Sequence, residues 1–162
     1  MKKKLMLLMV VLLTAISANA QFEQGKIYTG ASLTGLDLSY NGKKGMNLGL
    51  QARAGYLLED NWMVLGQAAF QHTGKDDAPD YFSVGVGARY YIVQNGLFLG
   101  ANCNFIHANS NYNDLMPGVE VGYAFFLSRT VTVEPSIYYN QSFKKHADYS
   151  TIGLKIGVGI YL

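Results

Sequence analysis

The chain has one cysteine and, after its first twenty residues, no apolar stretch that approaches twenty residues. The single cysteine, Cys103, excludes an internal disulfide. The missing apolar stretch excludes a membrane-spanning helix beyond residue 20, because such a helix needs about 20 apolar residues. The charges nearly balance, with 13 Lys and Arg against 11 Asp and Glu. Balanced charge gives no electrostatic basis for binding nucleic acid.

The first twenty residues have the pattern of a secretory signal peptide. A basic start at Lys2, Lys3 and Lys4 precedes an apolar run over residues 5–16, and small residues follow at 18–20. The apolar run is too short for a transmembrane helix. We expect cleavage of residues 1–20 and one mature domain over residues 21–162. Loss of the three leader lysines leaves 10 basic against 11 acidic residues.

The mature chain carries apolar residues at every second position in eight separate runs. They cover residues 27–33, 46–56, 64–70, 82–92, 97–105, 119–125, 131–139 and 152–162. A period of two places alternate residues on opposite faces of a β-strand, so the pattern predicts eight strands. No helical period competes with it. An even number of strands brings both ends of a barrel to the same side.

Charged residues avoid the apolar phase of these runs. From the second run onward none of the apolar-phase positions is Asp, Glu, Lys or Arg. A soluble barrel would show the reverse arrangement, with an apolar interior and a charged exterior. A basic residue facing the lipid midplane costs about 2–4 kcal/mol, which explains the exclusion. The sequence therefore predicts a transmembrane antiparallel up-and-down barrel, closed because lipid satisfies no open sheet edge.

The last run ends at the last residue and has one wholly aliphatic face. That face is formed by Ile152, Leu154, Ile156, Val158, Ile160 and Leu162. The other face carries Lys155 and three glycines. A strand of about ten residues with one such face is what a membrane barrel needs to span the bilayer.

The connections between the runs alternate in length. Residues 57–61, 93–96 and 126–130 form short connections, whereas residues 41–45, 72–80, 107–115 and 141–149 form mostly longer and more polar ones. Outer-membrane barrels have short periplasmic turns and long outer loops. Two irregularities stand out. The first run loses its phase near Gly35, where Leu36 and Leu38 take over, and Pro135 lies inside a run; we expect a bulge or an early strand end at the first and a local bulge at the second.

On the leader, the strand count, the alternating phases and the terminal strand, the chain resembles the small eight-stranded outer-membrane barrels of the OmpA transmembrane domain and OmpX type. The resemblance covers nearly all of residues 25–162 and implies a location in the outer membrane of a Gram-negative bacterium. It also implies that the alternate apolar positions of the last strand form the assembly signal for the insertion machinery. Those positions here are Leu154, Ile156, Val158, Ile160 and Leu162. The family usually ends in an aromatic residue, whereas this chain ends in Leu162 with Tyr161 one place earlier.

The polar phase of the runs supplies the first candidate site. It carries Arg53, Arg89, Glu120, Glu134 and Lys155, with several amides and nine glycines between them. Charges that face a narrow, partly dry lumen must find partners, because an unpaired buried ion costs several kcal/mol. The sequence predicts a salt-bridged plug, and a gate that rearranges to pass small ions is the alternative.

Other candidate sites rest on weaker patterns. Two sets of His, Ser and Asp near the outer rim would serve a lipid-modifying enzyme: His146, Asp148 and Ser150, and His107, Ser110 and Asp114. No motif supports a triad in either set. Loop charges suit phosphates or a shared cation, although hydrated loops with no specific ligand are the simpler explanation: Lys43, Lys44, Lys144 and Lys145, and Asp76, Asp77 and Asp80. We expect no cofactor and no metal.

Aromatic residues gather near the run ends, as in the two interfacial girdles of membrane barrels. Near the short connections these are Tyr56, Trp62, Tyr90, Phe98, Phe125 and Phe126, and near the long ones Phe70, Tyr81, Phe82, Phe105, Tyr139 and Tyr149.

The sequence thus predicts a monomeric, non-enzymatic outer-membrane barrel that acts in envelope structure or surface interaction through its loops. A small pore, a lipid-modifying enzyme and a secreted ligand-binding barrel are the alternatives. The expected partners are outer-membrane lipid and lipopolysaccharide, the insertion machinery during assembly and a surface ligand at the loops.

Overall fold

The structure, a computed structural model, describes residues 22–34, 47–73, 81–92, 95–108, 112–143 and 150–162. The strands are β1 (Ile27–Thr34), β2 (Asn47–Glu59), β3 (Trp62–Thr73), β4 (Tyr81–Tyr91), β5 (Leu97–Ala108), β6 (Tyr112–Tyr123), β7 (Phe125–Phe126), β8 (Val131–Asn140) and β9 (Thr151–Tyr161). No helix among these residues is long and apolar enough to cross a membrane.

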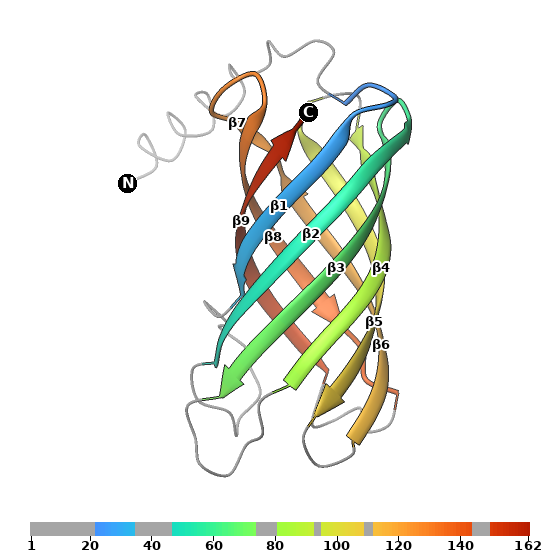
Figure 1. Ribbon diagram of the computed structural model, residues 1–162, viewed down its shortest axis with the longest axis vertical. Helices are drawn as coiled ribbons and strands as arrows, with labels where there is room; N and C mark the ends of the chain where they lie inside the picture. The colour runs from blue at the N-terminus through green and yellow to red at the C-terminus, as the bar shows by residue number, and fades with distance from the viewer. Residues whose placement is uncertain (1–21, 35–46, 74–80, 93–94, 109–111, 144–149) are drawn as a thin grey trace, which may run out of the picture.

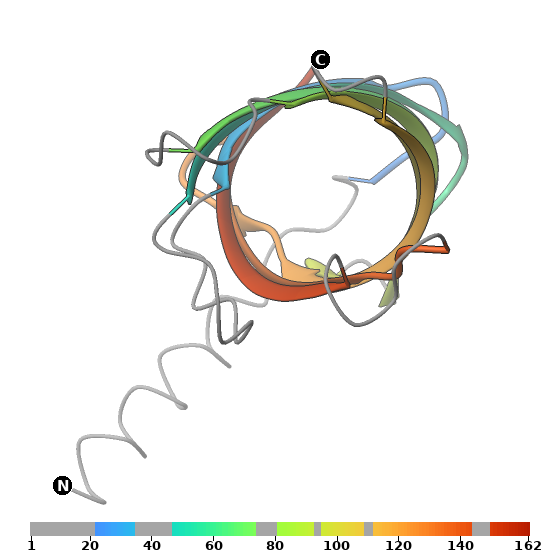
Figure 2. The ribbon, with the colours of Figure 1, turned by 90° about the horizontal axis from the view of Figure 1, so that it is seen from below.

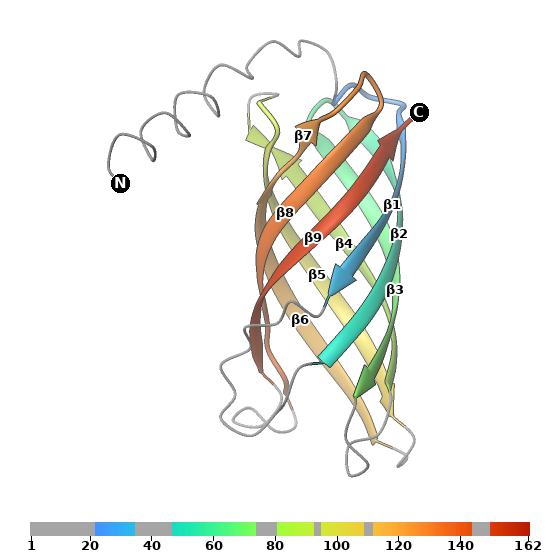
Figure 3. The same cartoon turned by 90° about the vertical axis from the view of Figure 1, so that its left-hand side faces the viewer.

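The strands form one closed antiparallel barrel. The strands from β1 to β6 each pair with the next in sequence, and β7 pairs with β8, which pairs with β9. The pairings of β1 with β9 and of β6 with β8 complete the ring. Figure 2 shows the ring end on, and Figure 3 shows β1 beside β9. β6 and β7 are two parts of one strand interrupted at Ala124, so the described part of the chain forms the eight-stranded barrel that the sequence predicts.

The two ends of the barrel differ. At one end, here called the turn end, lie the β2–β3 turn at Asp60–Asn61, the β7–β8 turn over residues 127–130, and the C-terminus (Figure 1). At the opposite end, the loop end, the strands lead into residues 35–46, 74–80, 109–111 and 144–149, which lie outside the described residues, as do the leader, Gly35, Leu36 and Leu38.

One of the predicted long loops is wrong, and of the predicted short connection 57–61 only residues 60–61 lie outside the strands. Residues 107–115 are mostly strand, because β5 continues to Ala108 and β6 begins at Tyr112. His107 pairs with Asn113 in this extension. The polar composition of the segment hid the strand, since residues beyond the lipid no longer need an apolar outward face.

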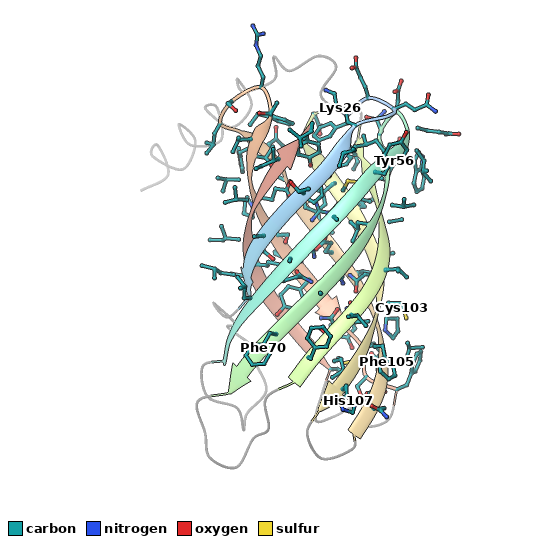
Figure 4. The ribbon with its side chains drawn as sticks, in the orientation of Figure 1. Lys26, Tyr56, Phe70, Cys103, Phe105 and His107 are labelled. Atoms are coloured by element: carbon teal, nitrogen blue, oxygen red, sulfur yellow. The ribbon has the colours of Figure 1, made fainter. Side chains whose placement is uncertain are left out.

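The faces of the strands follow the predicted phases. Apolar side chains such as Leu50 and Val86 point outward, with 59% and 69% of their surface exposed. Arg53 and Arg89, in the other phase, are buried inside. Figure 4 shows Tyr56 near the turn end and Phe70 and Phe105 near the loop end, consistent with two outer aromatic girdles.

Phe126 does not belong to the girdle at the turn end, because its partner Thr132 is buried and its ring packs against the aromatic cluster of the lumen. Phe98 does not belong to it either. Its side chain has no exposed surface and packs inside the barrel against Tyr91. The cause is its phase, because Phe98 is separated by even steps from the inward-facing Gly100 and Asn102.

Pro135 is accommodated without the bulge expected from the sequence. Its partner on β9 is Ile156, and the β8–β9 register continues unchanged on both sides. Toward β6 and β7, the pairs Gly122–Ser136 and Phe125–Val133 keep the same register, so no residue is inserted. Proline has no backbone N–H to donate, and Pro135 lies beside the point where the neighbouring strand is interrupted, at Ala124 between β6 and β7. The N–H of Ala124 donates to the carbonyl of Gly96.

Val86→Arg is expected to lower the unfolding free energy in lipid vesicles by about 2–4 kcal/mol, because it places a cation on the lipid face near the middle of β4. Urea titration of the folded protein in vesicles measures the change. Leu127→Arg is the matched control, since Leu127 is equally exposed but lies in the β7–β8 turn. An equal loss in the two variants would contradict a lipid-facing β4.

Candidate functional site in the barrel lumen

The five charged residues predicted to face the lumen come from five strands. Arg53 lies on β2, Arg89 on β4, Glu120 on β6, Glu134 on β8 and Lys155 on β9. Each points inward because it shares the polar phase of its strand, and each is at least 93% buried. The structure brings all five side chains into one hydrogen-bonded cluster, here called the lumen cluster.

Glu120 is the centre of the lumen cluster. Its carboxylate accepts two hydrogen bonds from Arg53, Nη1 to Oε1 and Nη2 to Oε2, both at 3.0 Å. Arg89 Nε donates to Oε1 at 2.9 Å, and Lys155 Nζ donates to Oε2 at 2.5 Å. Since β2 and β6 lie on opposite sides of the ring, the Arg53–Glu120 pair spans the lumen. Its two parallel bonds are the strongest geometry for an Arg–carboxylate pair.

Arg89 links Glu120 to the second carboxylate, Glu134. Its Nη1 donates to Glu134 Oε2 at 2.8 Å. The guanidinium also lies 4.1 Å above the centre of the Phe98 ring and 5.4 Å from that of Tyr28, within the range of cation–π attraction. Arg89 therefore fills the cross-section between the two acids, with charge on one side and aromatic rings on the other.

Glu134 receives three further hydrogen bonds. Tyr28 and Tyr161 donate from their hydroxyls at 2.9 Å and 3.1 Å, and Thr132 Oγ1 donates at 2.9 Å. A buried carboxylate with four donors is fully solvated by protein groups. The alternation of residues indicated that Glu134 faces inward, but no sequence pattern identified its tyrosine partners.

The lumen below the cluster, toward the turn end, is aromatic. Tyr91 and Tyr161 share a hydrogen bond between their hydroxyls at 2.7 Å, and both rings are buried. Sequence reasoning missed this layer. The available signal was that Tyr28, Tyr91, Phe98 and Tyr161 all occupy the polar phase, where an aromatic ring has no lipid to face.

The lumen above the cluster, toward the loop end, is lined by amides and hydroxyls. Gln67 Nε2 donates to Asn104 Oδ1, and Asn104 Nδ2 donates to Asn102 Oδ1. Nearer the loop end, Ser142 Oγ donates to Asp114 Oδ2 at 2.5 Å. The interior thus changes from aromatic to ionic to amide along the barrel axis.

The three cations of the lumen cluster exceed its two carboxylates by one charge when all five groups are ionised. Asp114, the other buried acid of the described lumen, lies six residues along β6 from Glu120 and pairs with Ser142 instead. Such a strand segment is about 20 Å long, so Asp114 neutralises little of this charge.

The candidate catalytic sets are not assembled among the described residues. His107 lies on the outer face of β5, where its Nδ1 is 2.7 Å from Asn113 Oδ1. Asp114 faces the lumen, so the barrel wall separates the two. Ser110, His146 and Asp148 lie outside the described residues, as do the seven Lys and Asp residues of the candidate loop sites.

Within the described residues, no three His, Cys, Asp or Glu side chains group in a way that would hold a metal ion. The oxygen atoms that do lie together, those of the hydroxyls and carboxylates around Arg89, already form hydrogen bonds with one another and with Arg89. The described lumen is therefore suited to filling space and pairing charge.

The architecture defines the class of protein: a closed antiparallel barrel with an apolar exterior and a polar, salt-bridged interior is a transmembrane β-barrel. The chain belongs to the outer membrane protein beta-barrel domain family, whose model matches residues 6–161. It is thus an integral protein of the outer membrane of a Gram-negative bacterium. No curated protein is detectably similar to it in sequence.

Solved structures share the fold at low sequence identity. Neisserial surface protein A is 18% identical, with a TM-score of 0.62 over 83% of this chain and 95% of that one. The N-terminal barrel of OprF from Pseudomonas aeruginosa is 15% identical, with a TM-score of 0.62 over 86% and 98%. Ail, the attachment invasion locus protein of Yersinia pestis, is 16% identical, with a TM-score of 0.52 over 86% and 99%.

Glu120→Gln is expected to lower the unfolding free energy by about 3–5 kcal/mol, because it leaves three buried cations around a neutral amide. Urea unfolding in detergent or vesicles measures the loss. Glu59→Gln is the matched control, since Glu59 is exposed and its change should fall within about 0.5 kcal/mol. A loss for Glu120→Gln no larger than that of the control would show that the cluster contributes nothing to stability.

Gly122→Ala is expected to destabilise the barrel by about 1–3 kcal/mol. A Cβ at Gly122 would lie 2.6 Å from Ser136 Cβ and 2.8 Å from the carbonyl oxygen of Pro135, which cannot move independently of the backbone. Gly66→Ala is the control, because among the described residues a Cβ there meets no atom within 4 Å. Thermal unfolding should separate the two variants, and equal melting temperatures would argue against a tightly filled lumen.

Proposed function

We propose that this protein is a non-enzymatic barrel with a closed lumen, which acts in envelope structure or surface interaction through the segments at its loop end. The single observation that carries the proposal is Arg89, whose guanidinium bridges Glu120 and Glu134 and packs against Phe98. These groups block the cross-section of the lumen. An eight-stranded barrel has an interior about filled by side chains, so ions and solutes have no open path.

The outer end of the barrel supports a role in surface interaction. Its connecting segments include the lysines 43, 44, 144 and 145, and basic loops at this level suit the phosphates of lipopolysaccharide. Ail, which shares the fold, has been determined in complex with the heparin analogue sucrose octasulfate. We propose an anionic surface ligand for this chain on the charge of these loops, with the monomer as the acting form.

The separation of His107 from Asp114 by the barrel wall supports a non-enzymatic role, because general base and orienting acid must lie within hydrogen-bond reach. Assembly is proposed to follow the last strand. Leu154, Ile156, Val158 and Ile160 of β9, with Leu162 directly after it, present the outward apolar face. Both backbone groups of Leu162 bond to Ile27 of β1. The strand that closes the ring is thus also the one proposed to engage the insertion machinery.

Residues 21–162, refolded and inserted in a planar lipid bilayer, are expected to give a silent single-channel trace. Trp62 is the sole tryptophan and lies half-exposed on the outer face, so a blue shift of its fluorescence in vesicles reports insertion independently. Discrete openings in most inserted molecules would overturn the closed lumen and favour a small pore. Such a pore is expected to prefer anions, because the lumen cluster carries an excess cation.

The same single-channel measurement on Arg89→Ala tests whether the lumen cluster keeps the barrel closed. The substitution removes the bridge between Glu120 and Glu134, whereas the control, Arg129→Ala, removes an exposed arginine in the β7–β8 turn. Openings in the Arg89 variant, with silence in wild type and control, would locate the closure at the lumen cluster.

A further inference from the structure

Four residues that precede β1, Phe22–Gly25, bind across the β2–β3 turn. The N–H of Gly25 donates to the carbonyl of Leu57, and the N–H of Gln24 donates to Asp60 Oδ1, both at 2.9 Å. The carbonyl of Phe22 accepts from the N–H of Asn61, also at 2.9 Å. These bonds fix the segment at the turn end of the barrel.

The side chain of Phe22 enters the mouth of the barrel. It has no exposed surface and stacks on Tyr91, with ring centres 3.8 Å apart and planes 11° apart. It also meets Phe126 and Tyr161 edge-on, each with ring centres 5.5 Å apart. The ring therefore contacts three parts of the wall, β4, β7 and β9, from a segment that belongs to none of them.

The groups directly behind Phe22 lead to the lumen cluster. The Tyr91 hydroxyl bonds to that of Tyr161, and the Tyr161 hydroxyl donates to Glu134, which pairs with Arg89. Phe22 thus lies between this chain of polar groups and the water at the turn end.

The chain bends at Gly25, where the segment meets β1. Gly25 has a φ of +91°, which side chains rarely adopt, and a Cβ there would meet no described atom within 4 Å. Its conformation, rather than steric crowding, therefore requires glycine. At the other contact, Asn61 has a φ of +69°, and asparagine tolerates this region better than other side chains.

We propose that Phe22–Gly25 is a stopper that closes the turn-end mouth of the lumen and swings about Gly25. Docked, it shields Tyr91, Tyr161 and the lumen cluster from water; undocked, it exposes the two phenols. The inference deepens the closed-lumen function and rests on it. In the expected orientation, with turns at the periplasmic side, the stopper faces the periplasm.

The test uses residues 21–162 folded in detergent micelles and reads the stopper directly. Amide hydrogen exchange at Asn61 reports the bond to Phe22, and nitration of Tyr91 by tetranitromethane, followed by mass spectrometry, reports access to the phenol. In wild type the Asn61 amide is protected and Tyr91 is unmodified. Phe22→Ala is expected to speed Asn61 exchange at least about tenfold and to make Tyr91 reactive, while the β1–β9 amides keep their protection.

The control is Glu23→Ala, which alters an exposed neighbour in the same segment and should change neither readout. Gly25→Ala, which keeps the Phe22 ring but strains the hinge, should act in the same direction as Phe22→Ala. Gly25→Ala therefore still tests the stopper if Phe22→Ala fails to fold. Rapid Asn61 exchange in wild type, or no change in both variants, would overturn the stopper.

The two measurements distinguish failure of the closed lumen from failure of the stopper alone. Channel openings by wild-type protein whose Asn61 amide is protected would overturn the closed lumen and leave a docked segment that does not seal, which also overturns the stopper. A silent wild-type trace with an unprotected Asn61 amide would overturn the stopper alone.

Discussion

The constraint on which the structure depends is that lipid offers no partner to a backbone N–H or carbonyl. It forces the last strand to meet the first, and the pairing of β1 with β9 over Tyr28–Thr34 closes the ring. Closure at eight strands then fixes the width of the interior, because barrel diameter follows strand number and stagger. Every second side chain must fit that width. The glycines opposite bulky groups, such as Gly100 beside Glu120, follow from the same limit.

A lumen of this width holds little water, and the residues that face it are too polar to form a hydrophobic core. The charged groups inside must therefore form hydrogen bonds with one another. Glu120 accepts bonds from three cations and Glu134 from four donors of mixed kind. Buried ion pairs rarely add net stability over apolar packing, but losing one partner is costly. The cluster therefore acts mainly as a specific lock: strands β2, β4, β6, β8 and β9 must hold one register for all the bonds to form.

Much of the fold was predictable because a period of two is local information. The inward position of Arg53 or Lys155 follows from alternation alone. Its partner does not, since Arg53 and Glu120 are 67 residues apart and meet across the lumen only at the stagger the closed ring adopts. Phe98 was misplaced because an aromatic residue near a strand end suits both the interface and the interior. Phe22 gave no signal, because a single residue before the first strand belongs to no periodic pattern.

The layering of the interior distributes the stabilising contacts unevenly along the barrel axis. Toward the turn end, rings and ions contact one another from nearly every strand, so a change in one side chain disturbs several. Toward the loop end, amides such as Asn102 and Asn104 form short chains of hydrogen bonds between nearby residues. On the outer face, His107 forms a hydrogen bond with Asn113. A barrel built this way concentrates its stabilising contacts toward one end, and the interior toward the other end depends on fewer of them.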